Sequence, residues 1–291
     1  MQRAARPLAG RLAFPTARVL VAPAFLYKVE RPVSGDKQGP VTDLELASRL
    51  SYFLWSSQPD DELLFVAEAG QLRDPQQLLA QSKRMLKNDK TRRLATEFAC
   101  QWLHIYDFDQ LDEKSEKHFP QFTKLRGPMY EESILFFTDL LQNNGRVTDI
   151  LAADHTFVNG ELAQLYQIPG VTGGNWQKVS GVHKFDRGGI LGQATTLAKQ
   201  SGASRTSPIL RGNWISEVLL GERLPRPPKD VPQLPDEESA TQQLSVRELV
   251  AQHSSDAKCA VCHQRIDPLG FSLENFDAIG RRREKDLGDR P

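Results

Sequence analysis

Cysteine, methionine and histidine are scarce in this chain, at three, three and six of 291 residues, and its charges cancel, with 37 Lys and Arg against 37 Asp and Glu. A neutral chain has no global field that would draw it to nucleic acid or to an anionic membrane. No apolar run approaches the length of a membrane span. A phosphate-binding glycine loop, a G-x-S-x-G elbow and an H-E-x-x-H pair are also missing. We therefore expect neither a nucleic-acid partner, nor a membrane span in this chain, nor nucleotide or hydrolase chemistry.

Two of the three cysteines lie in one short motif, which reads Cys259-Ala260-Val261-Cys262-His263. This C-x-x-C-H pattern is typical of the attachment site of a c-type haem. Two thiols three positions apart lie on one face of a helical turn, where both can bond to the vinyl groups of one porphyrin. The histidine that follows can bind the iron as proximal ligand. The motif predicts one covalently attached haem c held by Cys259, Cys262 and His263, with His263 as the metal ligand.

Other roles of the two cysteines fit the sequence less well. A structural zinc site needs four ligands, and the remaining cysteine, Cys100, lies in an apolar helical run without a cysteine partner nearby. A thioredoxin-type pair belongs to a βαβ pattern, which the sequence around residue 259 does not show. A disulfide between Cys259 and Cys262 would close a small, strained loop and would give no role to His263. It stays open as the basis of a haem-free binding module.

The sixth ligand of the iron is not evident, because Met1, Met85 and Met129 all precede the motif. The ligand is then a residue of the preceding helical region, a residue of a further C-terminal part, or absent. The histidine candidates are His104, His118, His155 and His183. A methionine or histidine ligand would indicate electron transfer, whereas an open iron would permit peroxide or oxygen chemistry.

Two further features near the motif have a haem-related and an ordinary interpretation. A backbone carbonyl between Asp267 and Leu269 could accept the Nδ1–H of His263, as is common in cytochromes, or this segment could be a plain turn. Arg205 and Arg211 could pair with haem propionates, or they could form structural salt bridges. The sequence alone leaves both pairs of alternatives open.

Helical periodicity dominates the first two-thirds of the chain. Thr42-Asp43-Leu44-Glu45 is a capping box that opens a helix ending near Trp55. Helix starts are also indicated at residues 59–62, where acids follow a proline, and at Asp74-Pro75. Apolar spacing predicts a long helix over about residues 126–142.

The composition changes after residue 170, where glycines mark a loop. Residues 171–182 suggest a short hairpin or an irregular strand. We expect helices to open at residues 187–192, to run from about 211 to 220, and to run from 244 to 253 before the motif. Five prolines within residues 225–235 predict an extended arm.

These patterns predict a mainly α protein, in which a helical domain is followed by a smaller, mostly helical, cytochrome-c-like haem domain joined through Gly/Pro-rich loops. We place an N-terminal segment at residues 1–39, the tail of a missing upstream region. The helical domain takes residues 40–170, and the domain with the haem motif takes residues 171–291 and is truncated at its C-terminal end.

Several segments together resemble the planctomycete-type cytochrome-c-like proteins. The segments are LASRLSYFLWSSQPDDELL (46–64), Phe157-Val158-Asn159, Arg187-Gly188-Gly189, Arg205-Thr206-Ser207-Pro208 and CAVCHQRIDPLGFSLENFDAIGRRR (259–283). These relatives are large exported bacterial proteins built from several domains of unknown function. The resemblance implies two adjacent domains, one helical and one carrying the haem motif, within an internal piece of a longer protein.

Motif and resemblance together predict a c-type haem protein that takes part in electron transfer within a larger exported bacterial redox protein. Its partners would be redox proteins or further domains of the same polypeptide. We expect a periplasmic or otherwise exported location, because haem is attached through thioethers outside the bacterial cytoplasm. Whether the chain is an enzyme stays open. The alternatives are a haem oxidoreductase of peroxidase or oxygenase type with an open distal site, and the haem-free module.

Overall fold

The computed structural model describes residues 15–27, 30, 39–111, 113–222, 224–225, 244–254 and 257–285. Most of the expected N-terminal segment and of the proline-rich arm lies outside the described residues. By internal packing the chain divides into two compact units, residues 1–53 with 57–82 and residues 54–56 with 83–291. This division rests on packing, whereas the domain boundary at residue 170 was placed from sequence patterns. That boundary stays a prediction.

The first unit is helical. Its elements are α2 (Pro23–Leu26), most of α3 (Asp43–Trp55), α4 (Asp61–Glu68) and most of α5 (Pro75–Leu86). The capping box predicted for α3 is present, because the Glu45 carboxylate accepts from the Thr42 N–H at 2.7 Å and the Thr42 hydroxyl accepts from the Glu45 N–H at 3.3 Å. The Asp60 side chain caps α4 by accepting from the Leu63 N–H. The predicted start of α5 at Pro75 is also confirmed.

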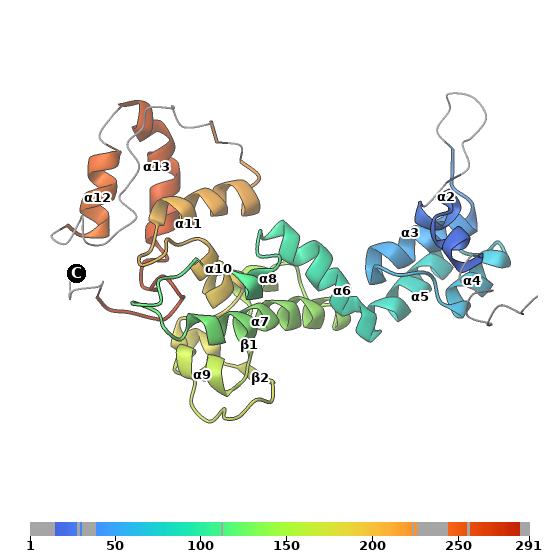
Figure 1. Cartoon of the computed structure of the whole chain (residues 1–291), viewed down its shortest axis with the longest axis horizontal. Helices are drawn as coiled ribbons and strands as arrows, with labels where there is room; N and C mark the ends of the chain where they lie inside the picture. The colour runs from blue at the N-terminus through green and yellow to red at the C-terminus, as the bar shows by residue number, and fades with distance from the viewer. Residues whose placement is uncertain are drawn as a thin grey trace, which may run out of the picture. The chain divides into compact units, whose positions relative to one another are not determined.

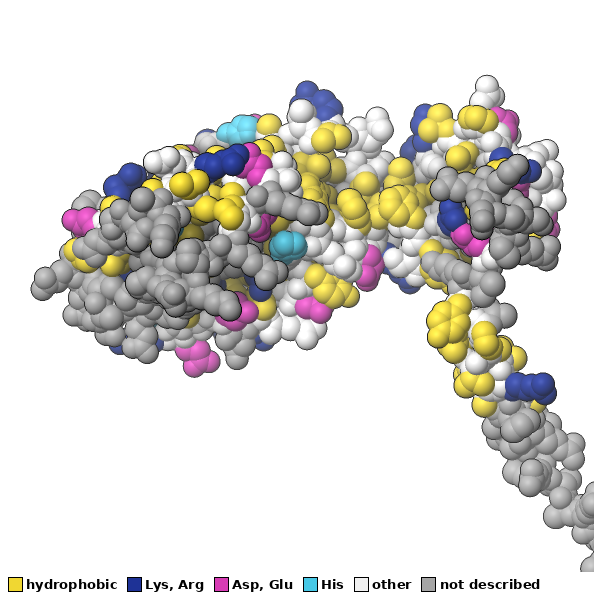
Figure 2. Space-filling model, turned by 90° about the horizontal axis from the view of Figure 1, so that it is seen from above, with side chains coloured by type: hydrophobic (Ala, Val, Ile, Leu, Met, Phe, Trp, Pro, Cys, Tyr) yellow, Lys and Arg dark blue, Asp and Glu magenta, His cyan; other side chains and the backbone are white. Residues whose placement is uncertain are grey.

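The N-terminal helical stretch carries hydrophobic side chains on its surface (Figure 2). They belong to Val19, Leu20, Val21, Phe25, Leu26 and Tyr27, and all are about half exposed or more. Among the described residues, no helix is long and apolar enough to cross a membrane.

The second unit is built on α7 (Phe122–Gln142), which begins four residues earlier than predicted (Figure 1). The shorter helices of this unit are α6 (Arg92–Leu94), α8 (Asp149–Ala152), α9 (Gly160–Tyr166), α10 (Ala194–Lys199), α11 (Pro208–Trp214), α12 (Val246–His253) and α13 (Ala257–Phe271). One hydrophobic core joins residues from Ala95 to Ile279. The described part of the chain is thus mainly α, as predicted.

A two-stranded antiparallel sheet lies against α7. It consists of β1 (His155–Val158) and β2 (Gln177–Ser180), with His155 opposite Ser180. The strand β2 falls in the segment for which the sequence suggested a short hairpin or an irregular strand, and it pairs outside that segment, with β1. Its partner β1 precedes α9, so this helix lies in the connection between the two strands.

A buried carboxylate connects α7 to the following segments of the second unit. Glu132 on α7 accepts hydrogen bonds from the hydroxyls of Thr156 and of Tyr166, the latter at 2.5 Å. The guanidinium of Arg187 lies 3.9 Å from the centre of the Tyr166 ring. Burial raises the pKa of Glu132 to about 7, although both hydroxyls and Arg187 act to lower it. This enclosed cluster ties α7 and α9 to Arg187.

Two tryptophans close to π-helical segments form long-range hydrogen bonds. Trp102 follows η2 (Ala95–Cys100), and Trp214 precedes η6 (Ile215–Leu219), which continues α11. The Trp214 indole donates to the Leu103 carbonyl at 2.9 Å, and the Trp102 indole donates to the Val218 carbonyl at 3.3 Å. These bonds fix η6, and with it α11, against the core.

The helices α11 and α13 lie side by side and approach closely at two glycines (Figure 1). A Cβ at Gly270 of α13 would lie 1.8 Å from the Pro208 carbonyl oxygen, and one at Gly212 of α11 would lie 2.0 Å from the Ile266 carbonyl oxygen. Only a residue without a side chain fits at either position. The crossing therefore determines where α13, the helix with the C-x-x-C-H motif, is held.

Candidate functional site

The three residues of the predicted haem site share one helix. Cys259, Cys262 and His263 lie on α13, and positions i, i+3 and i+4 of a helix fall on the same face. Both thiols are half-buried and neither forms a disulfide, whereas the His263 side chain is buried. The helix thus presents two unpaired thiols beside an enclosed imidazole.

The His263 ring is oriented by a carboxylate one turn further along α13. Its Nδ1 lies 2.9 Å from Oδ1 and 3.1 Å from Oδ2 of Asp267. A backbone carbonyl of residues 267–269 was the acceptor suggested by the sequence, and the structure instead places the side chain of Asp267 there. In the neutral ring, an anionic acceptor favours the tautomer with the proton on Nδ1, which leaves the lone pair on the ring's other nitrogen, Nε2.

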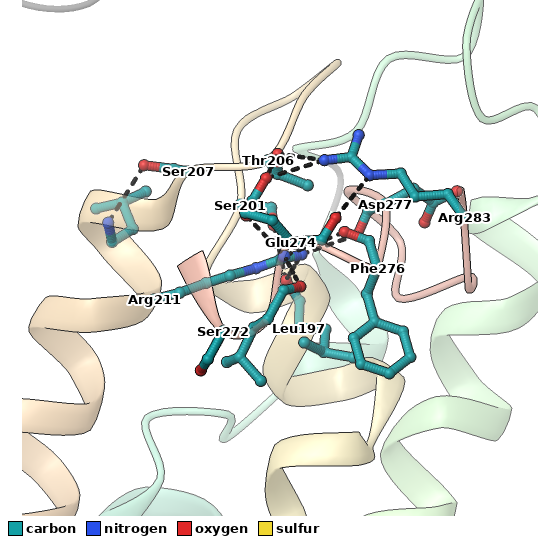
Figure 3. Close-up of polar contacts among 12 residues, drawn as sticks. Leu197, Ser201, Thr206, Ser207, Arg211, Ser272, Glu274, Phe276, Asp277 and Arg283 are labelled. Atoms are coloured by element: carbon teal, nitrogen blue, oxygen red, sulfur yellow. Dashed lines mark hydrogen bonds and ion pairs between the residues drawn. The ribbon is translucent and has the colours of Figure 1, made fainter. Parts of the chain in front are cut away.

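A buried arginine donates hydrogen bonds to the loop that follows α13 (Figure 3). Arg211 of α11 is 1% exposed, and both its terminal nitrogens donate to protein groups. The acceptors are the carbonyls of Leu197, Leu273, Phe276 and Asp277, the Ser201 hydroxyl and the Glu274 carboxylate. Burial lowers the pKa of Arg211 to about 10, which still leaves it charged at neutral pH. These contacts favour the structural interpretation of Arg211 over propionate binding.

The Glu274 carboxylate extends this network on its other side. It accepts from Arg283 at 2.9 Å and from the Thr206 hydroxyl at 2.5 Å. Arg205, the second arginine considered for propionates, is half-buried in the adjoining turn. The network anchors the C-terminal end of α13 to the turn before α11, and the motif lies at the other end of the same helix.

The histidines considered as a sixth ligand have local contacts of their own. His118 Nδ1 lies 3.0 Å from the Ser115 hydroxyl. The rings of His155 and His183 lie 3.4 and 3.5 Å from Asp139 and Asp154. Within the described ranges, no group of three or more His, Cys, Asp and Glu side chains is arranged to hold a metal ion. The identity of the sixth ligand stays open, and His104 stays a candidate with the other three histidines.

The donor set on α13 fits a covalently attached haem. Thioether attachment requires two reduced thiols, and Cys259 and Cys262 are both unpaired. Iron ligation by His263 would require the remaining ring nitrogen to keep its lone pair, and the contact of Nδ1 with Asp267 favours this. Two thiols and one imidazole fall short of the four ligands of a structural zinc site.

Two carboxylates of the second unit, Asp267 beside His263 and the buried Glu132, were not identified from the sequence. Asp267 could have been found from its spacing, because a residue four positions after His263 lies on the same helical face. Glu132 could not, because its neighbours Thr156, Tyr166 and Arg187 are distant in the sequence. Nothing in the helical pattern of α7 distinguishes Glu132 from an exposed glutamate.

Two family models match separate parts of the chain. Residues 41–168 match the model named PSD4, described as a protein of unknown function (DUF1592), and residues 187–286 match PSCyt3, with the same description (DUF1588). No curated protein and no solved structure matches the chain. The chain therefore contains a pair of adjacent domains of unknown function, as the resemblance implied, and the C-x-x-C-H motif lies in the second.

Proposed function

We propose that this chain is a c-type haem protein that transfers electrons within a larger exported bacterial redox protein. The observation that carries the proposal is the turn of α13 with Cys259, Cys262 and the oriented ring of His263. The name of the second family model, PSCyt3, is in keeping with a cytochrome-like role.

Each residue of the site has a definite task in this proposal. Cys259 and Cys262 tether the porphyrin through two thioether bonds, and His263 offers Nε2 to the iron while Nδ1 stays bonded to Asp267. When bound, haem c supplies a one-electron couple. The glycine crossing with α11 and the Arg211 network keep α13 in place during electron transfer.

Location and partners follow from the same chemistry. Thioether attachment takes place outside the bacterial cytoplasm, so we propose that the protein is periplasmic or otherwise exported. Its electron partners would be separate redox proteins or further domains of the same polypeptide. A neutral chain has no overall charge that would select a strongly charged partner.

Mass spectrometry after export in a host with haem-attachment machinery tests the proposal. We expect the mass of the chain plus one haem, and the spectrum of a haem with two thioethers. Cys259→Ala with Cys262→Ala should abolish attachment. The matched control is Cys100→Ala, which removes the buried third cysteine and should leave attachment intact. A colourless wild-type protein of unmodified mass would rule out the haem proposal and leave the haem-free module.

Absorbance spectra separate electron transfer from oxidoreductase chemistry. A six-coordinate, low-spin ferrous spectrum that carbon monoxide and cyanide leave unchanged supports electron transfer. A spectrum that shifts with carbon monoxide would indicate an accessible distal position and would favour the peroxidase or oxygenase alternative.

A further inference from the structure

The contact between His263 and Asp267 differs from an ordinary surface ion pair. Both carboxylate oxygens lie within 3.1 Å of the same ring nitrogen, Nδ1. The side chains are only 9% and 16% exposed. Exposed pairs at i and i+4 of a helix contribute a few tenths of a kcal/mol, and water screens them. An enclosed pair is screened less, so the negative charge of Asp267 acts on the imidazole more strongly than an exposed carboxylate would.

We propose that Asp267 is a positioning residue for the haem iron, which orients His263 and lowers the reduction potential of the bound haem. The inference rests on the proposed haem attachment. It assigns to Asp267 a role that the motif alone does not, since C-x-x-C-H ends at His263.

The physical basis is the charge of the acceptor. A carboxylate accepts a stronger, charge-assisted hydrogen bond from Nδ1–H than a neutral carbonyl does. This bond increases the basicity of Nε2 and with it electron donation to the iron. Stronger donation stabilises ferric over ferrous iron, because the ferric ion carries the additional positive charge. A haem ligated by His263 therefore has a lower potential than one whose histidine is oriented by a carbonyl.

Redox titration of the holoprotein tests this role. Asp267→Asn keeps the size of the side chain and an acceptor oxygen but removes the charge. We expect the midpoint potential to rise, by about 59 mV for a tenfold loss of the preference for ferric iron in a one-electron couple. Outer-shell substitutions commonly change metal affinity by factors on the order of 10 to 100. Asp267→Glu, which restores the carboxylate, should bring the potential back toward the wild-type value.

The matched control removes a different carboxylate that also contacts α13. Glu222 accepts from Arg265 of that helix at 2.8 Å, in an ion pair that does not include the His263 ring. Glu222→Gln removes the same charge from the neighbourhood of α13 without altering the orienting bond. We expect its midpoint potential to lie much closer to wild type than that of Asp267→Asn. Equal shifts in both variants would mean a general charge effect and would overturn the role of Asp267.

The possible failures are distinguishable. A wild-type protein without haem overturns the proposed function, whereas a haem-bearing Asp267→Asn variant with an unchanged potential overturns only this inference. If Asp267→Asn does not mature, nuclear magnetic resonance of the ferrous wild-type holoprotein decides. A slowly exchanging Nδ1–H proton on His263 supports the bond to Asp267, and a proton that exchanges as fast as that of an exposed histidine overturns it.

Discussion

The two ends of α13 differ in the burial and the hydrogen bonding of the side chains around them. At the end with the motif, Cys259 and Cys262 are half-buried and form no disulfide. Beyond the other end, the buried side chain of Arg211 donates six hydrogen bonds, most of them to residues 273–277. The two thiols are thus partly accessible, whereas the guanidinium of Arg211 is enclosed by protein acceptors. The difference suggests that substitutions at one end should affect chemistry and those at the other should affect stability.

The largest loss of stability is expected from Arg211→Met. The substitution leaves the buried carbonyls around residues 273–277 without their donor, and removal of one partner from a buried ionic network costs about 3–5 kcal/mol. Urea unfolding measures the change. The control is Arg282→Met, whose exposed guanidinium pairs with Asp186, and its effect should be small. Equal effects of the two variants would contradict the anchoring role of Arg211.

A second enclosed charge should make stability depend on pH. Burial raises the pKa of Glu132 from 4.5 to about 7. Between these values the folded protein keeps a proton that the unfolded chain releases, so the free energy of unfolding falls as pH rises. The contribution of Glu132 is on the order of 3 kcal/mol across this window.

Glu132→Gln should remove this contribution and flatten the pH dependence of the free energy of unfolding. Urea titrations at pH 4.5, 5.5, 6.5 and 7.5, about one unit apart, span the window and measure this dependence. The glutamine can still accept hydrogen bonds from the hydroxyls of Thr156 and Tyr166. An unchanged slope between wild type and variant would show that Glu132 titrates like an exposed glutamate.

The glycine crossing of α11 and α13 gives an intermediate effect. Gly270→Ala forces a methyl group against the Pro208 carbonyl and should destabilise the fold by about 1–3 kcal/mol. Gly127→Ala on α7 is the control, because its Cβ would meet nothing within 4 Å. The control should be neutral or stabilising by up to about 1 kcal/mol, since alanine favours helix. Thermal unfolding compares them, and a Gly270→Ala variant as stable as wild type would show that the helices can separate.

The smallest effect on stability is expected at the motif itself. Cys259→Ala with Cys262→Ala in the haem-free protein should change the unfolding free energy by less than about 1 kcal/mol, because both side chains are half-buried. Cys100→Ala, at a fully buried position, should cost more. Denaturant unfolding of the apoproteins tests the ranking, and the reverse order would place the motif in the core.

Local features of the chain were predictable where neighbouring residues decide them. The capping box at Thr42 and the proline at the start of α5 required only residues a few positions apart, and both are present. The start of α7 was placed four residues late, because Phe122 and Leu125 belong to the core but were not counted in the apolar stripe. The shared helical face of Cys259, Cys262 and His263 was predictable for the same local reason, whereas their role in holding haem stays a prediction.

Sequence patterns alone sufficed to predict that the described chain is mainly helical and that two thiols and an imidazole share one face of a helix. Such features depend on spacing within a few residues. Long-range packing, in contrast, encloses Arg211, raises the pKa of Glu132 to about 7 and brings α11 against α13 at two glycines. Burial depends on segments far apart in the chain, and the energies of charges depend on burial.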